Sequence, residues 1–497
     1  MSSLLRTKSV ADLQATLAEA EGVHGLKRTL SAFDLVMLGI GAVIGAGIFS
    51  AIGTAAVGEV AADGTVTRYG AGPALVLSFL LLGAVCALAG LCYAELTSMI
   101  PIAGSAYTYA YATLGEIVAW IIGWDLILEY AVGNAAVAVA WSDYFTSFLR
   151  VFGIRFPYWL ATSYRDVAIA YPQRLGELPV LFGHHVAINV PGMVIVAVIT
   201  WVLVIGIKES ARVNNAMVIL KLAVLALFVG VGSFYIDPRN WTPFAPNGWT
   251  GIHQGAAIVF FAYIGFDAVS TAAEETKNPK KDVPLGLMLC LGVVIILYVS
   301  VAFVLTGIVP YKLIDVGNAL PASLARIGIQ WGGAIVATGA IIGMISTLLV
   351  TLYGQIRIFM VMARDGLLPS AFAKVHPTHK TPHLCTWITG IATAAIAGLF
   401  PLPMIIDLCN IGTLFAFVLV SVGVILLRRT RPEVERKFRT PGVPFTPLVT
   451  VAFCFYLMYS LPKVTWIRFG VWLLAGLLIY FLYSVRHSKL QHPAGQA

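Results

Sequence analysis

Long apolar stretches recur along almost the whole chain, and they restrict its fold more than any other feature. A helix needs about 20 apolar residues to cross the hydrocarbon core of a bilayer, and about twelve stretches come close to or exceed this length. They show neither the alternation nor the hairpin turns of strands, so each one predicts a transmembrane helix. The stretches are Phe33–Ala55, Gly72–Met99, Ile117–Ser142, Val186–Ile207, Ala216–Tyr235, Gly255–Ala273, Leu285–Val309, Gly332–Met362, Thr386–Phe400, Ile405–Leu427, Phe445–Leu461 and Ile467–Val485.

The composition agrees with a chain that meets lipid over much of its surface. Of the 497 residues, 59% are hydrophobic and only 11% are charged, whereas soluble domains carry about 25% charged residues. The six cysteines lie in or beside apolar stretches, so we expect small core residues and neither a disulfide framework nor a metal site. The sequence therefore predicts an all-α membrane protein.

The distribution of basic residues predicts the orientation of the chain. Cytoplasmic loops of membrane proteins are enriched in Lys and Arg. With an even number of spans and both termini in the cytoplasm, most of the 32 Lys and Arg residues fall on the cytoplasmic side. The basic run Arg428–Arg439 also has the composition of a nucleic-acid patch, but it lies between two spans. We interpret it as a loop that meets anionic headgroups, so nucleic acid is not an expected partner.

The same patterns predict how the chain is divided. No signal-peptide pattern precedes the first span, and the N-terminus has the composition of a polar, partly helical cytoplasmic segment. The long stretch 149–185 is expected to be an external cap without assigned chemistry. The predicted parts are a cytoplasmic segment (1–30), a ten-helix core (31–427), a basic cytoplasmic loop (428–444), two additional transmembrane helices (445–487) and a cytoplasmic tail (488–497).

Two of the spans are interrupted near their middles by glycine-bearing sequence. The first, FDLVMLGIGAVIGAGIFSAIG, concentrates glycines between Gly39 and Gly47, and the second, GAAIVFFAYIGFDAVSTAAEE, places Gly265 close to Asp267. Unwound backbone survives inside a bilayer only where it lines a cavity. A matched pair of interrupted spans therefore indicates a solute-binding site. The alternative is that the glycines only permit close helix packing, which we expect for Gly39.

The order of the interrupted spans predicts the topology. They are the first and the sixth, as two five-helix units of inverted topology require. The last two spans then lie outside this repeat. No repeat of short period is visible in the sequence.

Several motifs carry a family resemblance between about residue 30 and residue 385. They are MLGIGAVIGAGIF, YAELTSMIPIAGSAYTYAYATLGE, GWDLILEYAVGNAAVAVAWS, FFAYIGFDAVSTAAEETKNPKKDVP and LYGQIRIFMVMARDGLLP. With these motifs the chain resembles the amino acid–polyamine–organocation superfamily, and within it most closely the cationic amino acid transporter family. The resemblance implies the fold of the bacterial leucine transporter, with a 5+5 inverted repeat. Relatives often carry Thr or Ser where this chain has Ala46, so we expect no side-chain contact with substrate there.

Interrupted helices offer unpaired backbone groups that suit both charges of a zwitterion. Free N–H groups lie at a positive dipole end and free C=O groups at a negative one. Together with the resemblance, this predicts N–H groups for a substrate carboxylate and carbonyl groups for a substrate ammonium. The N–H candidates are Gly45, Ala46 and Gly47; the carbonyl candidates are Val43, Phe261, Ala262 and Ile264; Ile44 belongs to the same interrupted segment.

Lys221 is a basic residue well inside an apolar span. A charge in this position costs at least about 2.5–3.5 kcal/mol on insertion scales, and burial favours the neutral amine. Sodium-coupled relatives of this fold hold a cation between the first and eighth spans, and the Lys221 ammonium is predicted to replace it, near Ser346 and Thr347. The alternative is a snorkelling lysine, but the cytoplasmic end is about 12 Å away. We expect Lys221 to couple transport to a proton.

Three carboxylates lie near the predicted site. Asp125 and Glu129 are four residues apart on one helix face, and Asp267 follows the second interruption. By resemblance, Glu129 and Asp267 border the pocket for the substrate side chain. The alternative for each is a carboxylate satisfied by neighbouring helix ends, which we favour for Asp125. Glu95, at a cytoplasmic helix end, is expected to be architectural.

Two further residues are candidates for contact with the substrate. By resemblance Thr351 lines the side-chain pocket, and Phe261 is a candidate aromatic lid, with core packing as the alternative for the latter. Asp407, in the tenth span, has no assigned role.

These observations predict a secondary active, proton-coupled amino acid transporter, an importer that works by alternating access. Its expected substrate is a cationic and/or small neutral L-amino acid. A sodium-independent exchanger remains the alternative, although an exchanger has less need of Lys221. An enzyme or receptor would need a catalytic dyad or a soluble output domain, and the sequence offers neither.

The remaining expectations concern cofactors, partners and location. The histidines of Lys374–His383 lack acidic or cysteine partners, so no metal is expected. No phosphate-binding glycine loop precedes a lysine, so ATP is not an expected energy source, and no cofactor is predicted. The expected partners are an L-amino acid, a proton and the lipid bilayer, for a monomer that spans the plasma membrane many times.

Overall fold

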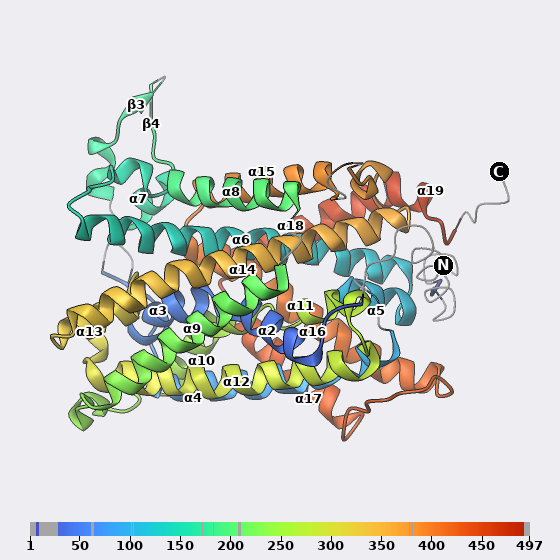
Figure 1. Ribbon diagram of the computed structural model, residues 1–497, viewed down its shortest axis with the longest axis horizontal. Coiled ribbons are helices and arrows are strands. Elements are labelled where there is room, and N and C mark those ends of the chain that lie inside the picture. The colour runs from blue at the N-terminus through green and yellow to red at the C-terminus, as the bar shows by residue number, and fades with distance from the viewer. Residues whose placement is uncertain are drawn as a thin grey trace.

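The computed structural model describes residues 6–8, 28–60, 64–100, 102, 104–170, 172–181, 183–206, 210–376, 378 and 381–491. Most of the predicted segment 1–30 and of the predicted tail 488–497 lies outside these residues. Helices form the body of the molecule, and most run along its long axis (Figure 1). Two small antiparallel hairpins, β1 (Gly58–Val60) with β2 (Val66–Tyr69) and β3 (Val180–Leu181) with β4 (His184–His185), lie in connections.

The long helices correspond to the predicted spans. Ten spans are largely continuous, whereas the first and sixth are interrupted. In chain order they are α2 (Ala32–Val43) with η1 (Gly47–Ala51) and α3 (Ile52–Val57); α4 (Leu75–Met99); α6 (Glu116–Val151); α8 (Val190–Ile205); α9 (Ser210–Ser233); α10 (Gly248–Val259) with η6 (Phe260–Tyr263) and α11 (Ala268–Thr271); α12 (Pro279–Ile308); α14 (Gln330–Arg364); α15 (His383–Leu399); α16 (Leu402–Thr430); α17 (Phe445–Tyr459); and α18 (Lys463–Ile479) with η10 (Tyr480–Ser484) and α19 (Val485–His487).

Shorter helices lie between the spans. One of them, α5, follows α4 and was not predicted, because its apolar run is short. They are η2 (Gly72–Ala74), α5 (Ser105–Thr113), η3 (Tyr158–Leu160), α7 (Tyr164–Ala170), η4 (Pro172–Glu177), η5 (Pro238–Trp241), η7 (Ala273–Glu275), η8 (Tyr311–Leu313), α13 (Ala319–Arg326) and η9 (Ser370–Ala373).

The prediction of about twelve transmembrane helices is confirmed. Among the described residues, 7 helices are long and apolar enough to cross a membrane alone, and the bent pair Ala32–Val43 and Gly47–Val57 makes an eighth. Three further spans, α8, α15 and α17, are shorter apolar helices. The remaining span, α6, is 36 residues long and carries several acidic side chains.

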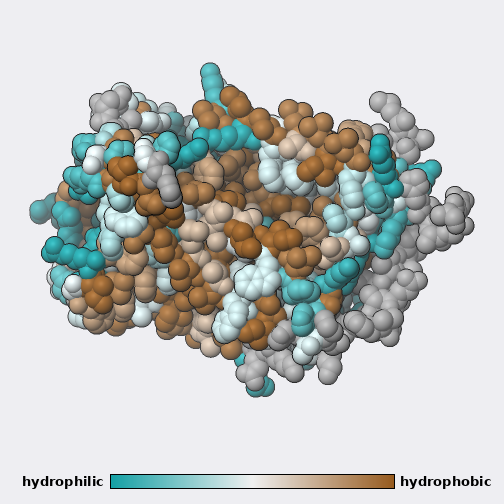
Figure 2. All heavy atoms as spheres, turned by 90° about the horizontal axis from the view of Figure 1, so that it is seen from above, coloured by the Kyte–Doolittle hydropathy of each residue, from teal (hydrophilic) through white to brown (hydrophobic). Residues whose placement is uncertain are grey.

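The surface fits a bilayer. Figure 2 shows a broad apolar band across the middle of the face that it presents, with hydrophilic residues gathered toward the two ends. Large apolar side chains project outward, including Ile296, 71% exposed, and Leu482, 69% exposed. Contiguous apolar surface of this kind is unfavourable in water and favourable against lipid tails.

The helix ends follow local sequence. The Ser31 side chain accepts a hydrogen bond from the Asp34 N–H while the Asp34 carboxylate accepts one from the Ser31 N–H, which forms a capping box before α2. Asn189 caps α8 by accepting from the Gly192 N–H at 3.0 Å. These caps satisfy N–H groups that have no partner within the helix.

Glu95 joins the end of α4 to the basic loop. It is 1% exposed and accepts from Arg428 Nε at 2.9 Å and Nη2 at 2.7 Å, and from the Thr440 N–H at 2.8 Å. Part of the basic run is thus held by an internal carboxylate, as expected for an architectural residue.

We expect Glu95→Gln to lower the thermal stability of the purified protein, by about 1–3 kcal/mol, because Arg428 loses its charged partner. The measurement is thermal unfolding in detergent. Glu433→Gln is the matched control, since the Glu433 side chain is exposed. Equal melting temperatures for the two variants would show that this ion pair contributes nothing to stability.

Asp407 has a partner that the sequence did not reveal. Its Oδ2 lies 2.5 Å from Nη2 of Arg68, which comes from β2. Arg68 Nε also lies 3.7 Å from Oε2 of Glu59 on β1. The ion pair fastens the hairpin that follows α3 onto α16.

Candidate functional site

The first span is interrupted between α2 and η1. Helix α2 ends at Val43, and Ile44 has extended backbone with φ −77° and ψ 93°. The second half resumes as a short π-helix from Gly47, and the two halves meet at an angle of 44°. The first N–H groups of the resumed helix have no intrahelical acceptor, and they point back toward the interruption.

The sixth span is interrupted between η6 and α11. The helix tightens over Phe260–Tyr263, and Ile264 is extended with ψ 141°. Gly265 then has φ +109°, a backbone conformation that residues other than glycine rarely adopt. Both interruptions lie where the sequence predicted them.

The two interrupted segments touch through their backbones. A methyl group on Gly47 would lie 2.2 Å from Cα of Ala262, and one on Gly265 would lie 3.2 Å from the carbonyl carbon of Ala42. Gly39 has the packing role expected of it, because a methyl there would lie 2.7 Å from Cγ2 of Val269. Close backbone contact of this kind requires glycine.

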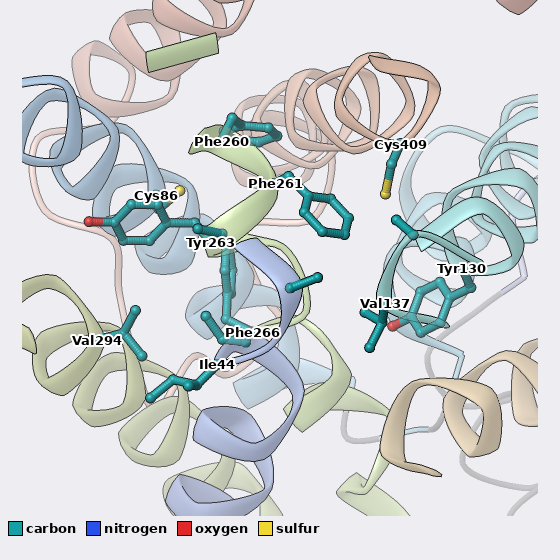
Figure 3. Packing of buried hydrophobic residues seen from close by; sticks show 14 of the residues in the cluster. Ile44, Cys86, Tyr130, Val137, Phe260, Phe261, Tyr263, Phe266, Val294 and Cys409 are labelled. Carbon is teal, nitrogen blue, oxygen red and sulfur yellow. The ribbon is translucent and has the colours of Figure 1, made fainter. Parts of the chain in front are cut away.

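A cavity lies between the interrupted segments, α6 and α14. The cavity together with its opening holds about 450 Å³ of space free of protein atoms. In Figure 3, Phe261 on η6 faces Tyr130 and Val137 on α6 across this space. The lining residues are Ala42, Val43, Gly45, Ala46, Gly47, Glu129, Tyr130, Gly133, Asn134, Val137, Phe261, Ile264, Gly265, Thr347 and Thr351.

Most of the predicted substrate-binding residues line this cavity, but three do not. The lining includes Val43, Gly45, Ala46, Gly47, Phe261, Ile264, Glu129 and Thr351. Ile44, Ala262 and Asp267 are outside the lining. Sequence reasoning missed Asn134 and Val137, although their spacing from Tyr130 on one helix face was a usable signal.

Lys221 points into the first interruption. It is 0% exposed, and its Nζ donates to the carbonyls of Ile44 at 2.8 Å and Gly41 at 3.0 Å, and to Oγ1 of Thr347 at 3.3 Å. These carbonyls belong to the last turn of α2, where a positive charge is favourable. The side chain therefore does not snorkel toward the membrane surface.

Of the two hydroxyls expected near Lys221, only Thr347 contacts it. Thr347 Oγ1 lies 3.0 Å from the carbonyl oxygens of both Gly41 and Ile44. Ser346 instead donates to Oδ1 of Asn214 at 3.1 Å. The helical rotation between neighbouring residues turns the Ser346 side chain toward α9, away from the ammonium.

The three carboxylates have different surroundings. Asp267 accepts from Ser105 Oγ at 2.9 Å and from Tyr130 Oη at 3.2 Å. Glu129 lines the cavity, and its Oε2 has no hydrogen-bond partner among the described residues. Within the same residues neither oxygen of Asp125 has a partner, so the interpretation of Asp125 as a carboxylate satisfied by neighbouring helix ends is wrong.

A chain of hydrogen-bonded polar residues on α6 and α14 forms one wall of the cavity. Thr351 donates to Oδ1 of Asn134 and to the Thr347 carbonyl, the latter at 2.7 Å. Asn134 Nδ2 donates to the Tyr130 carbonyl at 2.8 Å. On the other side, Tyr298 donates to the Val43 carbonyl at 3.1 Å, which leaves that oxygen one further lone pair.

A cavity enclosed by two interrupted transmembrane helices is the arrangement of a secondary transporter. Comparison with known proteins agrees. The family model described as amino acid permease matches residues 30–483, so the chain belongs to this family, within the amino acid–polyamine–organocation superfamily.

Individual relatives are similar over nearly the whole chain. The branched-chain amino acid permease BcaP of Bacillus subtilis (strain 168) is 48% identical over 98% of this chain and 99% of its own length. The methylthioribose transporter of the same organism is 46% identical over 99% and 100%. Cationic amino acid transporter 9, chloroplastic, of Arabidopsis thaliana is 33% identical over 98% and 93%. The chain is therefore an integral, multi-pass membrane protein of an amino acid transport family.

Proposed function

We propose that this permease imports an L-amino acid together with a proton, by alternating access around the cavity between the interrupted helices. The observation that carries the proposal is the Lys221 ammonium, buried and bonded to the open carbonyl end of α2. We place the protein in the plasma membrane as a monomer, with both termini in the cytoplasm. The ten-helix core would move the substrate, and the two last helices would support it.

The cavity offers groups for both charges of the substrate backbone. The N–H groups of Gly45, Ala46 and Gly47 would bind the carboxylate, because they begin the resumed helix at the cavity wall. The carbonyls of Phe261 and Ile264 would bind the ammonium. Ala262 and Ile44 are weaker candidates, since both lie outside the lining and the Ile44 carbonyl already accepts from Lys221.

Protonated Lys221 would hold the end of α2 in position for binding. Its positive charge strengthens hydrogen bonds to three acceptors at once. When the proton is lost, these hydrogen bonds weaken, and so does the contact between α9 and the interruption. Binding of the substrate and of the proton would then favour the same arrangement, which is the requirement for coupling.

The direct test is uptake of radiolabelled amino acids into proteoliposomes, with and without an inward-directed pH gradient and without sodium. We expect accumulation of an L-amino acid against its gradient only when the pH gradient is present. Uptake that needs amino acid on the inner side and ignores the gradient would identify an exchanger instead. Methylthioribose belongs in the same panel, because one relative carries that name.

Glu129 is the cavity residue that we expect to set the preference for side-chain charge. Its unpartnered Oε2 can accept from a cationic substrate side chain. Glu129→Gln should therefore weaken competition by arginine at least about fivefold, which corresponds to about 1 kcal/mol, and leave alanine uptake within about twofold.

The measurement is inhibition of alanine uptake by unlabelled arginine, with Asp143→Asn on the far part of α6 as the control. Failure of arginine to compete in the unmutated protein would exclude a cationic substrate and leave a small neutral one. An unchanged arginine preference in Glu129→Gln would remove this role from Glu129.

A further inference from the structure

Asp125 is an acid that the transport mechanism above leaves unused. Its side chain is 0% exposed, and among the described residues neither carboxyl oxygen has a hydrogen-bond partner. An ionised carboxylate in such surroundings costs several kcal/mol unless it is paired. In this conformation the carboxyl group must therefore be protonated.

The groups that face Asp125 supply no positive charge. Glu129 lies one turn along the same helix, and the Cys409 thiol on α16 and the Tyr93 hydroxyl on α4 also lie within electrostatic range of Asp125. The Cys409 thiol already donates to the Glu129 carbonyl at 3.4 Å. All three groups are either neutral or acidic. None of them therefore stabilises a negative charge on Asp125, and the protonated form is favoured.

A purely structural role does not account for this acid. The protonated form also gains nothing in this conformation, because its hydroxyl finds no acceptor among the described residues. A buried polar group without a partner costs about 1–3 kcal/mol. An apolar side chain of similar size would stabilise this conformation better, so the benefit of the carboxyl group lies in another conformation.

Helix α16 covers the carboxyl group directly. A methyl group on Gly412 would lie 2.7 Å from Oδ1 of Asp125. Only glycine lets the α16 backbone pass this close, and the contact excludes water from the acid. If the contact between α6 and α16 loosens during alternating access, water reaches the carboxyl group and ionisation becomes favourable.

We propose that Asp125 is a second proton-binding group of the transport cycle, which holds its proton while α6 and α16 are packed together and releases it to water when they separate. The inference rests on the proposed proton-coupled function, and it adds a site on α6, whereas Lys221 lies on α9. Asp125 needs no contact with the substrate for this role. Its proton would cross the membrane with the substrate and so contribute to the driving force of transport.

The test compares proton and substrate fluxes in proteoliposomes for the unmutated protein, Asp125→Asn and the control Glu433→Gln, which removes an exposed acid. Asparagine keeps the size of the side chain and cannot titrate. We expect Asp125→Asn to carry about one proton fewer per substrate, and Glu433→Gln to match the unmutated protein. Under a gradient of about one pH unit the accumulation ratio then falls about tenfold, because each coupled proton contributes a factor of ten per pH unit.

Substrate counterflow at equal pH serves as the measure of intact folding and binding, since it needs no net proton movement. If Asp125→Asn fails in counterflow, Asp125→Leu supplies the second variant. Leucine has a similar size and shape, cannot titrate and leaves no polar group without a partner, so it should show the same loss of about one proton per substrate.

An Asp125→Asn protein with an unchanged proton-to-substrate ratio would overturn the inference, as would an unchanged ratio in Asp125→Leu. In both cases, a lowered proton-to-substrate ratio in Lys221→Met would still support the proposed function. If the unmutated protein moves no protons with its substrate, the proposed function and this inference fail together.

Discussion

The Lys221→Met protein is expected to fold and to bind substrate. Its uptake under an imposed pH gradient should be at least about tenfold lower than that of the unmutated protein. Methionine matches the length and apolar stem of lysine but carries no proton. The carbonyls of Gly41 and Ile44 lose the ammonium that they share, at a cost of about 1–3 kcal/mol for each unsatisfied acceptor. The loss is partly offset because a buried charge is removed.

The measurement is initial uptake into proteoliposomes at several external pH values. Lys312→Met, at an exposed position in the connection after α12, is the matched control. The expected result is a normal pH profile for Lys312→Met and a weakened pH dependence for Lys221→Met, which retains only the part contributed by Asp125. If Lys221→Met keeps full proton dependence, Lys221 does not couple transport to protons.

The second large effect is expected for Gly47→Ala. The added methyl would lie 2.2 Å from Cα and 2.7 Å from the N atom of Ala262. Both are backbone atoms, so no side chain can rotate away, and the two interrupted segments must separate. Overpacking of this kind costs about 1–3 kcal/mol. Because the displaced N–H groups line the cavity, we expect uptake below about a tenth of normal, with substrate binding lost in parallel.

Gly230→Ala is the matched control for this prediction. Gly230 lies on α9, and a methyl group there meets no atom within 4 Å. Binding to the purified protein and uptake should be unchanged in this variant. Normal binding by Gly47→Ala would mean that contact between the two interruptions is not needed to form the site.

The sequence was sufficient for the features that depend on local chemistry. Apolar length predicts the spans, and glycine placement predicts both interruptions. The spans and the interruptions follow from a few neighbouring residues each. The position of Lys221 beside the first interruption was instead implied by the resemblance, because sodium-coupled relatives of this fold hold a cation between the first and eighth spans.

The features that were missed depend on pairing between distant segments. Arg68 and Asp407 meet across more than three hundred residues of sequence, and no local pattern indicates such a pair. The sequence also did not indicate that Ser105 on α5 donates to the Asp267 carboxylate, because α5 itself was not predicted. Likewise the unpartnered state of Asp125 depends on how closely α16 passes at Gly412, which the sequence does not state.

The central claim is that the backbone of an amino acid is held by peptide groups of the two interrupted helices, and ligand-induced thermal stabilisation of the purified protein tests it most directly. The ligands are a transported L-amino acid, its carboxamide, and the corresponding acid without the amino group. We expect stabilisation by the zwitterion alone, because each analogue lacks one of the two charged ends. Equal stabilisation by either analogue, or stabilisation by methylthioribose and by no amino acid, would contradict the claim.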